Sequence, residues 1–136
     1  MKPFYIYLLA TLGIILAIGT ALYLLSIQPE STSATLEKAL YIIDGDTFNT
    51  QSGETIRLLC VDTPERSQTG YEDASAYLSM LILGKDVKVE REYGKDKYNR
   101  TLAWVYVDNI LVNKMIIDEG FGVLYEYEGT NCERVK

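Results

Sequence analysis

The sequence has 136 residues, a formal net charge of −6, two cysteines and no histidine. The negative charge argues against tight, non-specific binding to duplex DNA, which depends on many lysine and arginine contacts to phosphates. Without histidine, and with Cys60 and Cys132 far apart, no zinc-ligand spacing exists, so we expect no zinc site.

The N-terminal segment is apolar. Residues 4–27 carry no charge and are long enough to cross a bilayer, which takes about 20 apolar residues. A cleavable signal has a shorter apolar region, about 7–15 residues, and the only small-residue site, at 32–34, lies well past it. We therefore predict a transmembrane anchor over residues 1–28 and a linker over residues 29–34, with a cleaved signal as the alternative. Lys2 precedes the apolar run, which by the positive-inside rule places the rest of the chain outside the cell.

Residues 35–136 are predicted to form one domain of mixed helices and strands. Helical spacing of apolar residues predicts a helix that begins near Glu72 and ends before Gly84, and a shorter helix over residues 112–119. Apolar and β-branched residues predict strands, with a hairpin loop at 51–53; the strands are expected over residues 36–43, 47–50, 54–59, 87–92 and 102–107.

The segment RLLCVDTPE, residues 57–65, places an arginine at one end of an apolar stretch and two acids at the other. A guanidinium fork suits a phosphate, and carboxylates suit a hard cation or a general base. An edge strand with an arginine salt bridge and a proline-stopped turn is the alternative. The segment alone does not separate these two interpretations.

Two further motifs accompany it: DGDT at residues 44–47 and DKYNR at residues 96–100. The three motifs in this order resemble those of the staphylococcal nuclease (thermonuclease) family, and the resemblance covers residues 35–127. It implies an α+β fold: a five-stranded Greek-key β-barrel of the OB type with packed helices. The C-terminal helix of the family is expected to be missing, because the sequence ends at Lys136.

The resemblance also implies a calcium site. Asp46 and Asp62 match the calcium carboxylates of the family, and Thr63 matches the position that adds a backbone carbonyl. Two carboxylates would form an open site in which water and substrate complete the oxygen shell. On spacing alone Asp44 and Asp46 are more typical of turn residues than of ligands; the resemblance makes Asp46 the ligand and leaves Asp44 in the turn.

Three residues match the catalytic positions of the family. Arg57 and Arg100 match the arginines that hold the scissile phosphate, and Glu65 matches the residue assigned as general base. Alone, Arg100 would be interpreted as a surface charge. Asn99 replaces a glycine of the family, and asparagine tolerates the left-handed backbone better than most residues.

A lysine and several tyrosines match positions that line the nucleotide pocket, where aromatic faces stack on bases. With eleven tyrosines in the chain, a coincidental match is easy. The predicted nucleotide-binding residues are Lys97, Tyr98, Tyr125 and Tyr127.

Taken together, the resemblance implies a calcium-dependent endonuclease that cuts single-stranded DNA and RNA with low sequence specificity and leaves 3′-phosphates. We expect a monomer without a protein partner, anchored in the membrane with the nuclease domain extracellular, or secreted if the N-terminal segment is cleaved. The alternative is an inactive OB-type module that binds nucleic acid or protein at the membrane. Retention of Arg57, Glu65 and Arg100 favours the enzyme.

The two cysteines have two interpretations. In an oxidising space a Cys60–Cys132 disulfide is plausible, and family geometry brings the two regions together; two buried free thiols are the alternative. If the bridge exists, we expect its reduction to lower the melting temperature with little direct effect on the active site.

Overall fold

The computed structural model describes residues 13–23, 33–127 and 129–136. The chain divides into two compact units, Met1–Ser31 and Thr32–Lys136. In the first unit, residues 13–23 are helical. The predicted anchor extends beyond this helix on both sides, into residues outside the described part of the chain. Among the described residues, no helix is both long and apolar enough to span a bilayer.

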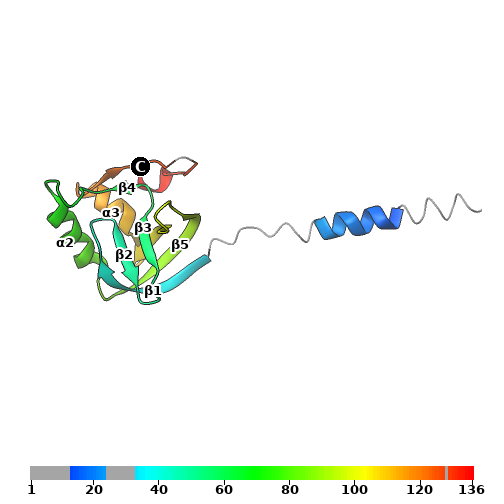
Figure 1. The fold of residues 1–136 in the computed structure, drawn as a ribbon, viewed down its shortest axis with the longest axis horizontal. Coiled ribbons are helices and arrows are strands. Elements are labelled where there is room, and N and C mark those ends of the chain that lie inside the picture. The colour runs from blue at the N-terminus through cyan, green and yellow to red at the C-terminus, as the bar shows by residue number, and fades with distance from the viewer. Residues whose placement is uncertain (1–12, 24–32, 128) are drawn as a thin grey trace, which may run out of the picture. The chain divides into compact units, whose positions relative to one another are not determined.

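The second unit contains short strands and helices in an α+β order (Figure 1). They are β1 (Ser33–Ile42), β2 (Thr47–Thr50), β3 (Thr55–Leu58), β4 (Val61–Asp62), α2 (Tyr71–Ile82), β5 (Asp86–Lys95), β6 (Thr101–Val107), β7 (Ile110–Leu111), α3 (Val112–Asp118), β8 (Val123–Leu124) and the 3-10 helix η1 (Glu133–Val135).

The main sheet closes into a barrel. Its strand order is β3-β2-β1-β5-β6-β7, and a parallel pairing of β3 with β6 joins the two sides, with Ile56 opposite Thr101 and Leu58 opposite Ala103. A bulge between Ala39 and Tyr41 bends β1, so that its first part pairs with β5 and its last part with β2. The prediction of a five-stranded α+β barrel is confirmed.

The barrel interior and the two helices share one apolar core. Leu78 and Ile82 of α2 and Ile116 of α3 pack on inward-facing residues of the strands. Figure 1 shows α2 on one flank of the barrel. In β6, Ala103, Val105 and Val107 belong to this core, while Leu102 and Trp104 point to the opposite face. This explains why residues 102–107 are apolar at successive positions.

A second, smaller core covers that opposite face of β6. It joins Leu102 and Trp104 to Cys132 and Val135 of the C-terminal segment. Trp104 is fully buried, and the guanidinium of Arg134 lies 5.3 Å from its ring centre. The structure contains a Cys60–Cys132 disulfide, with the two Cα atoms 5.7 Å apart, which ties this segment to the barrel.

The segment 57–65 is not one strand. Cys60 has a left-handed φ of 61°, which ends β3 at Leu58 and starts β4 at Val61. The β4–β8 pairing and β7 were not predicted, since strands of two residues carry no period. β7 follows a two-residue turn in which Asp108 and Asn109 have φ values of 49° and 64°, as a type I′ hairpin requires.

Candidate active site

A pocket of about 710 Å³ opens where the β3–β4 turn, the β5–β6 loop and the segment after β8 meet. It is lined by all three predicted catalytic residues, one predicted calcium ligand and all four predicted nucleotide-binding residues: Arg57, Glu65 and Arg100; Asp62; Lys97, Tyr98, Tyr125 and Tyr127. Asp46 and Thr63 do not line the pocket, but both are buried next to Arg57 and Asp62.

Asp46 is fixed in place by its neighbours. The Asp46 N–H donates to Oδ1 of Asp44 at 3.1 Å, so Asp44 forms the turn. Thr63 donates from its N–H and its Oγ1 to Oδ2 of Asp46, each at 2.9 Å. Burial raises the pKa of Asp46 to about 6; Arg57 acts to lower it, and the charge of Asp44 acts to raise it. The carboxylate of Asp46 therefore lies in a buried position where its charged form is disfavoured.

Arg57 links the two predicted calcium carboxylates. Its side chain is 6% exposed and forms ion pairs with Asp46 and, at 3.2 Å, with Asp62. Its Nε and Nη1 are buried and make no directed hydrogen bond to any described residue. The close contact of Nη1 with Asp46 is thus an ion pair without hydrogen-bond geometry. The guanidinium keeps donor capacity that the described residues do not use.

Asp96 holds the backbone and the side chain of Arg100 across the loop between β5 and β6. Its Nε and Nη2 lie 2.8 and 2.7 Å from Oδ2 of Asp96, and its N–H donates to Oδ1 at 3.0 Å. Burial acts to raise the pKa of Asp96, but the hydrogen bonds from Arg100 and from the Tyr98 N–H outweigh it, so this pKa is lowered. Asn99 has a left-handed φ of 65°, in the conformation that asparagine tolerates.

Glu65 lies in the exposed turn between β4 and α2. Its N–H donates to Oε1 of Gln68, and its carbonyl accepts the Gln68 N–H, both at 2.7 Å. Within the described ranges its carboxylate makes no hydrogen bond or ion pair. The backbone of Glu65 is thus fixed by Gln68, while its carboxylate has no partner among the described residues.

Aromatic rings form the other side of the pocket. The rings of Tyr125 and Tyr127 meet edge to face at 4.8 Å between centroids. The Tyr98 ring has the Lys97 ammonium 5.0 Å and the Arg100 guanidinium 5.2 Å from its centre. Burial raises the pKa of Tyr127. With Tyr98 67% and Tyr125 47% exposed, these rings offer open faces for stacking.

Several residues that shape the site were not predicted. Tyr93 and Lys95 line the pocket from the end of β5, where continued alternation beyond residue 92 would have indicated them. Asn113 is fully buried at the start of α3: its Oδ1 accepts the Val105 N–H at 2.9 Å, and its Nδ2 donates to the carbonyls of Leu59 and Ala103. The sequence signal that could have identified Asn113 is a polar residue at the otherwise apolar start of a predicted helix.

The residues around Asp46 fit an oxygen-bound cation. No group of three or more candidate metal-binding side chains gathers among the described residues. Asp46 and Asp62 nevertheless share Arg57, and with Asp44 nearby the acids outnumber the arginine. Burial is the main cause of the raised pKa of Asp46, and a hard cation bound there would stabilise the charged form of the carboxylate.

Comparison with known proteins points to one family. The family model described as staphylococcal nuclease homologue matches residues 55–136, which begin after the DGDT turn. The endonuclease YncB of Bacillus subtilis is 36% identical over 113 residues, covering 74% of this chain and 52% of the relative. The SPbeta prophage-derived endonuclease YokF of the same species is 37% identical over 111 residues, covering 73% and 36%.

An uncharacterized protein of Bacillus anthracis is 35% identical over 98 residues, covering 64% of this chain and 46% of the relative. The matched part thus spans about half, or less, of the length of these curated relatives. The family model nevertheless covers more than half of the chain, including Arg57, Glu65 and Arg100. This chain belongs to the family of staphylococcal nuclease homologues.

Proposed function

We propose that the chain is a calcium-dependent endonuclease that hydrolyses single-stranded DNA and RNA with low sequence specificity to 3′-phosphate products. The observation that carries the proposal is the pocket that brings Arg57, Arg100 and the carboxylate of Glu65 together. The relatives named as endonucleases support the same activity.

In the proposed reaction, Arg57 and Arg100 donate hydrogen bonds to the phosphate and stabilise the charge that grows in the transition state. Glu65 accepts a proton from the attacking water. The water oxygen bonds to phosphorus, the bond to the 5′ oxygen breaks, the 5′ oxygen takes a proton from solvent, and the phosphate stays on the 3′ side. Asp46 and Asp62, with the Thr63 carbonyl, would hold a calcium ion, which supplies Lewis-acid polarisation of a phosphoryl oxygen.

The preference for single strands is proposed from the aromatic side of the pocket. Base stacking on rings such as Tyr98 and Tyr125 tolerates any sequence and requires bases that are unpaired. The net charge of −6 provides little attraction to the phosphates of an intact duplex.

A binding module without turnover is the second candidate. The ion pairs of Arg57 with Asp46 and Asp62 favour it, because they engage both calcium carboxylates and part of the guanidinium that would bind phosphate. The enzyme requires that substrate and cation together replace these pairs.

A cleavage assay separates the two candidates. The purified full-length chain is incubated with a fluorescently labelled single-stranded oligonucleotide, with calcium or with a chelator, and wild type is compared with Glu65→Gln. We expect multiple turnovers that need both calcium and Glu65, with phosphatase-sensitive 3′ ends. Undiminished cleavage in chelator would remove the calcium role, and binding without cleavage would establish the module.

A further inference from the structure

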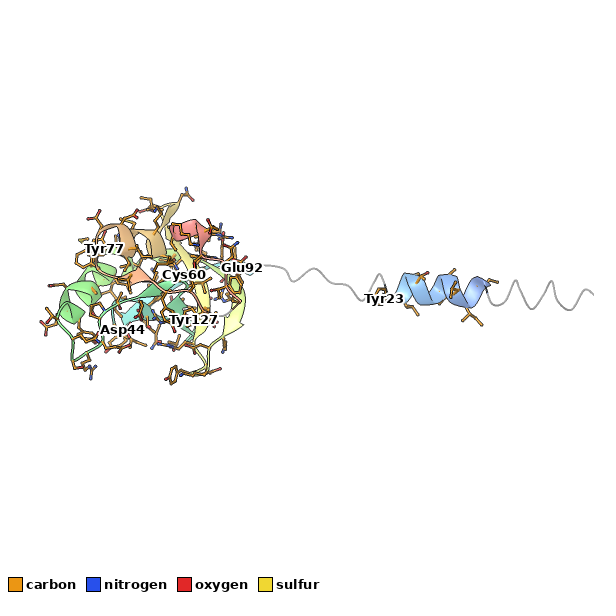
Figure 2. All side chains as sticks on the ribbon, turned by 90° about the horizontal axis from the view of Figure 1, so that it is seen from above. Tyr23, Asp44, Cys60, Tyr77, Glu92 and Tyr127 are labelled. Atoms are coloured by element: carbon orange, nitrogen blue, oxygen red, sulfur yellow. A yellow bond between two sulfur atoms is a disulfide. The ribbon has the colours of Figure 1, made fainter. Side chains whose placement is uncertain are left out.

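Tyr125 and Tyr127, which line the pocket, are together called the tyrosine wall. Cys60 is attached to the chain on both sides of these two residues. The Cys60 carbonyl accepts the Tyr125 N–H at 3.1 Å. The Cys60 sulfur is bonded to Cys132, beyond the other end of the wall. Figure 2 labels Cys60 and Tyr127 within the domain. The tyrosine wall is thus attached to Cys60 by a backbone hydrogen bond at its start and by a disulfide after it.

The same residue adjoins the side of the pocket that Arg57 and Asp62 line. Cys60 is fully buried in the left-handed turn between β3 and β4, so it lies in the chain between Arg57 and Asp62. A left-handed backbone is unfavourable for an ordinary residue, so surrounding contacts must hold this turn. Through Cys60, the turn that positions Arg57 and Asp62 is joined directly to the tyrosine wall.

Thr130 lies between the disulfide and the tyrosine wall and contacts both. The Tyr127 carbonyl accepts the N–H and the Oγ1 of Thr130 at 3.0 and 2.7 Å, and Thr130 Oγ1 lies 3.8 Å from the Cys132 sulfur. Both Tyr127 and Thr130 line the pocket. Thr130 therefore connects Cys132 to the pocket lining.

This region also has non-covalent attachments, and Tyr127 packs against the second, smaller core. The β4–β8 pairs end at Leu124, before the wall begins. Beyond Thr130, the Asn131 N–H donates to the Tyr93 hydroxyl at 3.0 Å, and Arg134 pairs with Glu90 at the surface. Surface ion pairs contribute little to stability. The disulfide is the covalent attachment among these contacts.

We propose that the Cys60–Cys132 disulfide is a positioning element of the substrate pocket, which holds the tyrosine wall against the arginines and sets the affinity for single-stranded substrate. The inference rests on the proposed function for the identity of the substrate. It differs from the expectation that reduction spares the active site, because the bridge is attached to both sides of the pocket. Full substrate affinity then requires an oxidised protein.

Hydrogen exchange tests the positioning role without any activity measurement. A dithiol reductant gives two electrons and two protons to the S–S bond, which becomes two thiols while the dithiol closes to a cyclic disulfide. In the reduced full-length chain, we expect the Tyr125 and Thr130 amides to exchange at least tenfold faster. The Val105 amide, bonded to Asn113 in the barrel, should keep its protection.

Steady-state kinetics tests the consequence for substrate. Reduction should raise KM for a single-stranded oligonucleotide several-fold, because the tyrosine wall loses its covalent attachment, and should change kcat less than KM. The double variant Cys60→Ser, Cys132→Ser should show the raised KM with or without reductant. Val87→Ala, which weakens the main core and leaves the bridge intact, should keep both the wild-type KM and the Tyr125 protection.

Three results would overturn the proposal: two free thiols in the protein isolated without reductant, unchanged Tyr125 and Thr130 exchange after complete reduction, or an equal loss of protection in Val87→Ala. If the oxidised chain cleaves nothing, the proposed function fails, while the exchange rates still decide the positioning role. If the serine variant does not fold, the reduced wild type, which keeps both sulfur atoms, supplies the same comparison.

Discussion

At the scale of single residues, the charged groups of the pocket share partners. Arg57 is buried between Asp46 and Asp62, and Arg100 is held by Asp96. Removing one partner of a buried pair leaves an uncompensated charge, which costs more than the pair itself contributes. Substitutions that keep charge and volume are therefore the sharper tests of chemistry.

We expect Arg100→Lys to lower kcat for oligonucleotide cleavage by about 10² to 10³, the typical effect of losing one preorganised donor to a developing charge. The guanidinium of Arg100 uses two nitrogens to contact Asp96 and has a third for the phosphate. A lysine has a single nitrogen and cannot reproduce this planar arrangement of donors. Arg134→Lys, at an arginine outside the pocket, is the matched control and should retain the wild-type rate. Equal rates in both variants would remove Arg100 from the reaction.

Gly45→Ala should destabilise the protein by about 1–3 kcal/mol, as overpacking does. A Cβ at Gly45 would lie 2.6 Å from Cβ of Ala74 and 2.8 Å from Oγ1 of Thr63. The new methyl group would push α2 away from the turn that holds Asp46. Urea denaturation measures the loss, and Gly45→Ala with Ala74→Gly should lose less than the sum of the two single variants. Simple additivity would contradict this contact.

At the scale of elements, the sequence predicted the regular elements well and the irregular ones poorly. The bounds of β2 agree, and α3 ends one residue earlier than predicted, because alternation and helical spacing report burial on one side. The short β4–β8 pairing depends on the Cys60 turn and on distant residues that bring its strands together. No local pattern encodes such a pairing.

In the candidate site, too, the sequence predicted some features and not others. Motif order placed Arg57, Glu65 and Arg100 at matching positions, and the structure brings them to one pocket. The Asp96 contacts to Arg100 and the position of Asn113 were not predicted, since each depends on which backbone groups a buried side chain meets. Pair contacts of this kind arise from tertiary structure.

Asn113→Ala should be among the most destabilising changes outside the apolar core. It would leave the Val105 N–H and the carbonyls of Leu59 and Ala103 without these bonds, at about 1–3 kcal/mol for each buried unsatisfied group. Asn49→Ala, which removes one half-buried contact to Thr55, is the control and should cost much less. Urea midpoints measure both, and equal losses would show that Asn113 does not link α3 to the barrel.

At the scale of the whole molecule, a network of charges connects strands across the barrel. Arg91 of β5 pairs with Glu37 of β1 and with Glu54 before β3, and Thr101 of β6 donates to Glu54 at 2.5 Å. Hydrogen bonds from Arg91 lower the pKa of Glu54 below its usual 4.5, although burial acts to raise it. The network joins segments that no single hairpin contains.

Because the pKa of Glu54 is lower in the folded state, its contribution to stability is complete above its usual value of 4.5 and is lost as the pH falls through the lowered value. We expect the melting temperature to fall in that acidic range, and to fall less steeply in Glu54→Gln. Glu65→Gln, at a carboxylate that forms no ion pair with the residues the structure describes, is the control and should follow the wild-type curve. Parallel curves for wild type and Glu54→Gln would contradict this coupling.

The N-terminal apolar segment leads to a prediction of cellular location. We propose that residues 1–28 anchor the protein, with the nuclease domain outside the cell. Full-length protein should remain in the membrane fraction after salt and alkaline washes, and protease added outside should reach the domain. Recovery of a soluble chain that begins near Thr35 would instead establish a cleaved signal.

The parallel pairing of β3 with β6 also has a consequence for folding during synthesis. The pairing joins Ile56 to Thr101 and Leu58 to Ala103, so a nascent chain cannot close the barrel until β6 has left the ribosome. Until then β3 exposes an unpaired edge, the kind of edge that joins other chains. Contacts between such distant residues are slow to form. Translation pauses before β6 would therefore prolong exposure of an aggregation-prone sheet, whereas pauses after it would not.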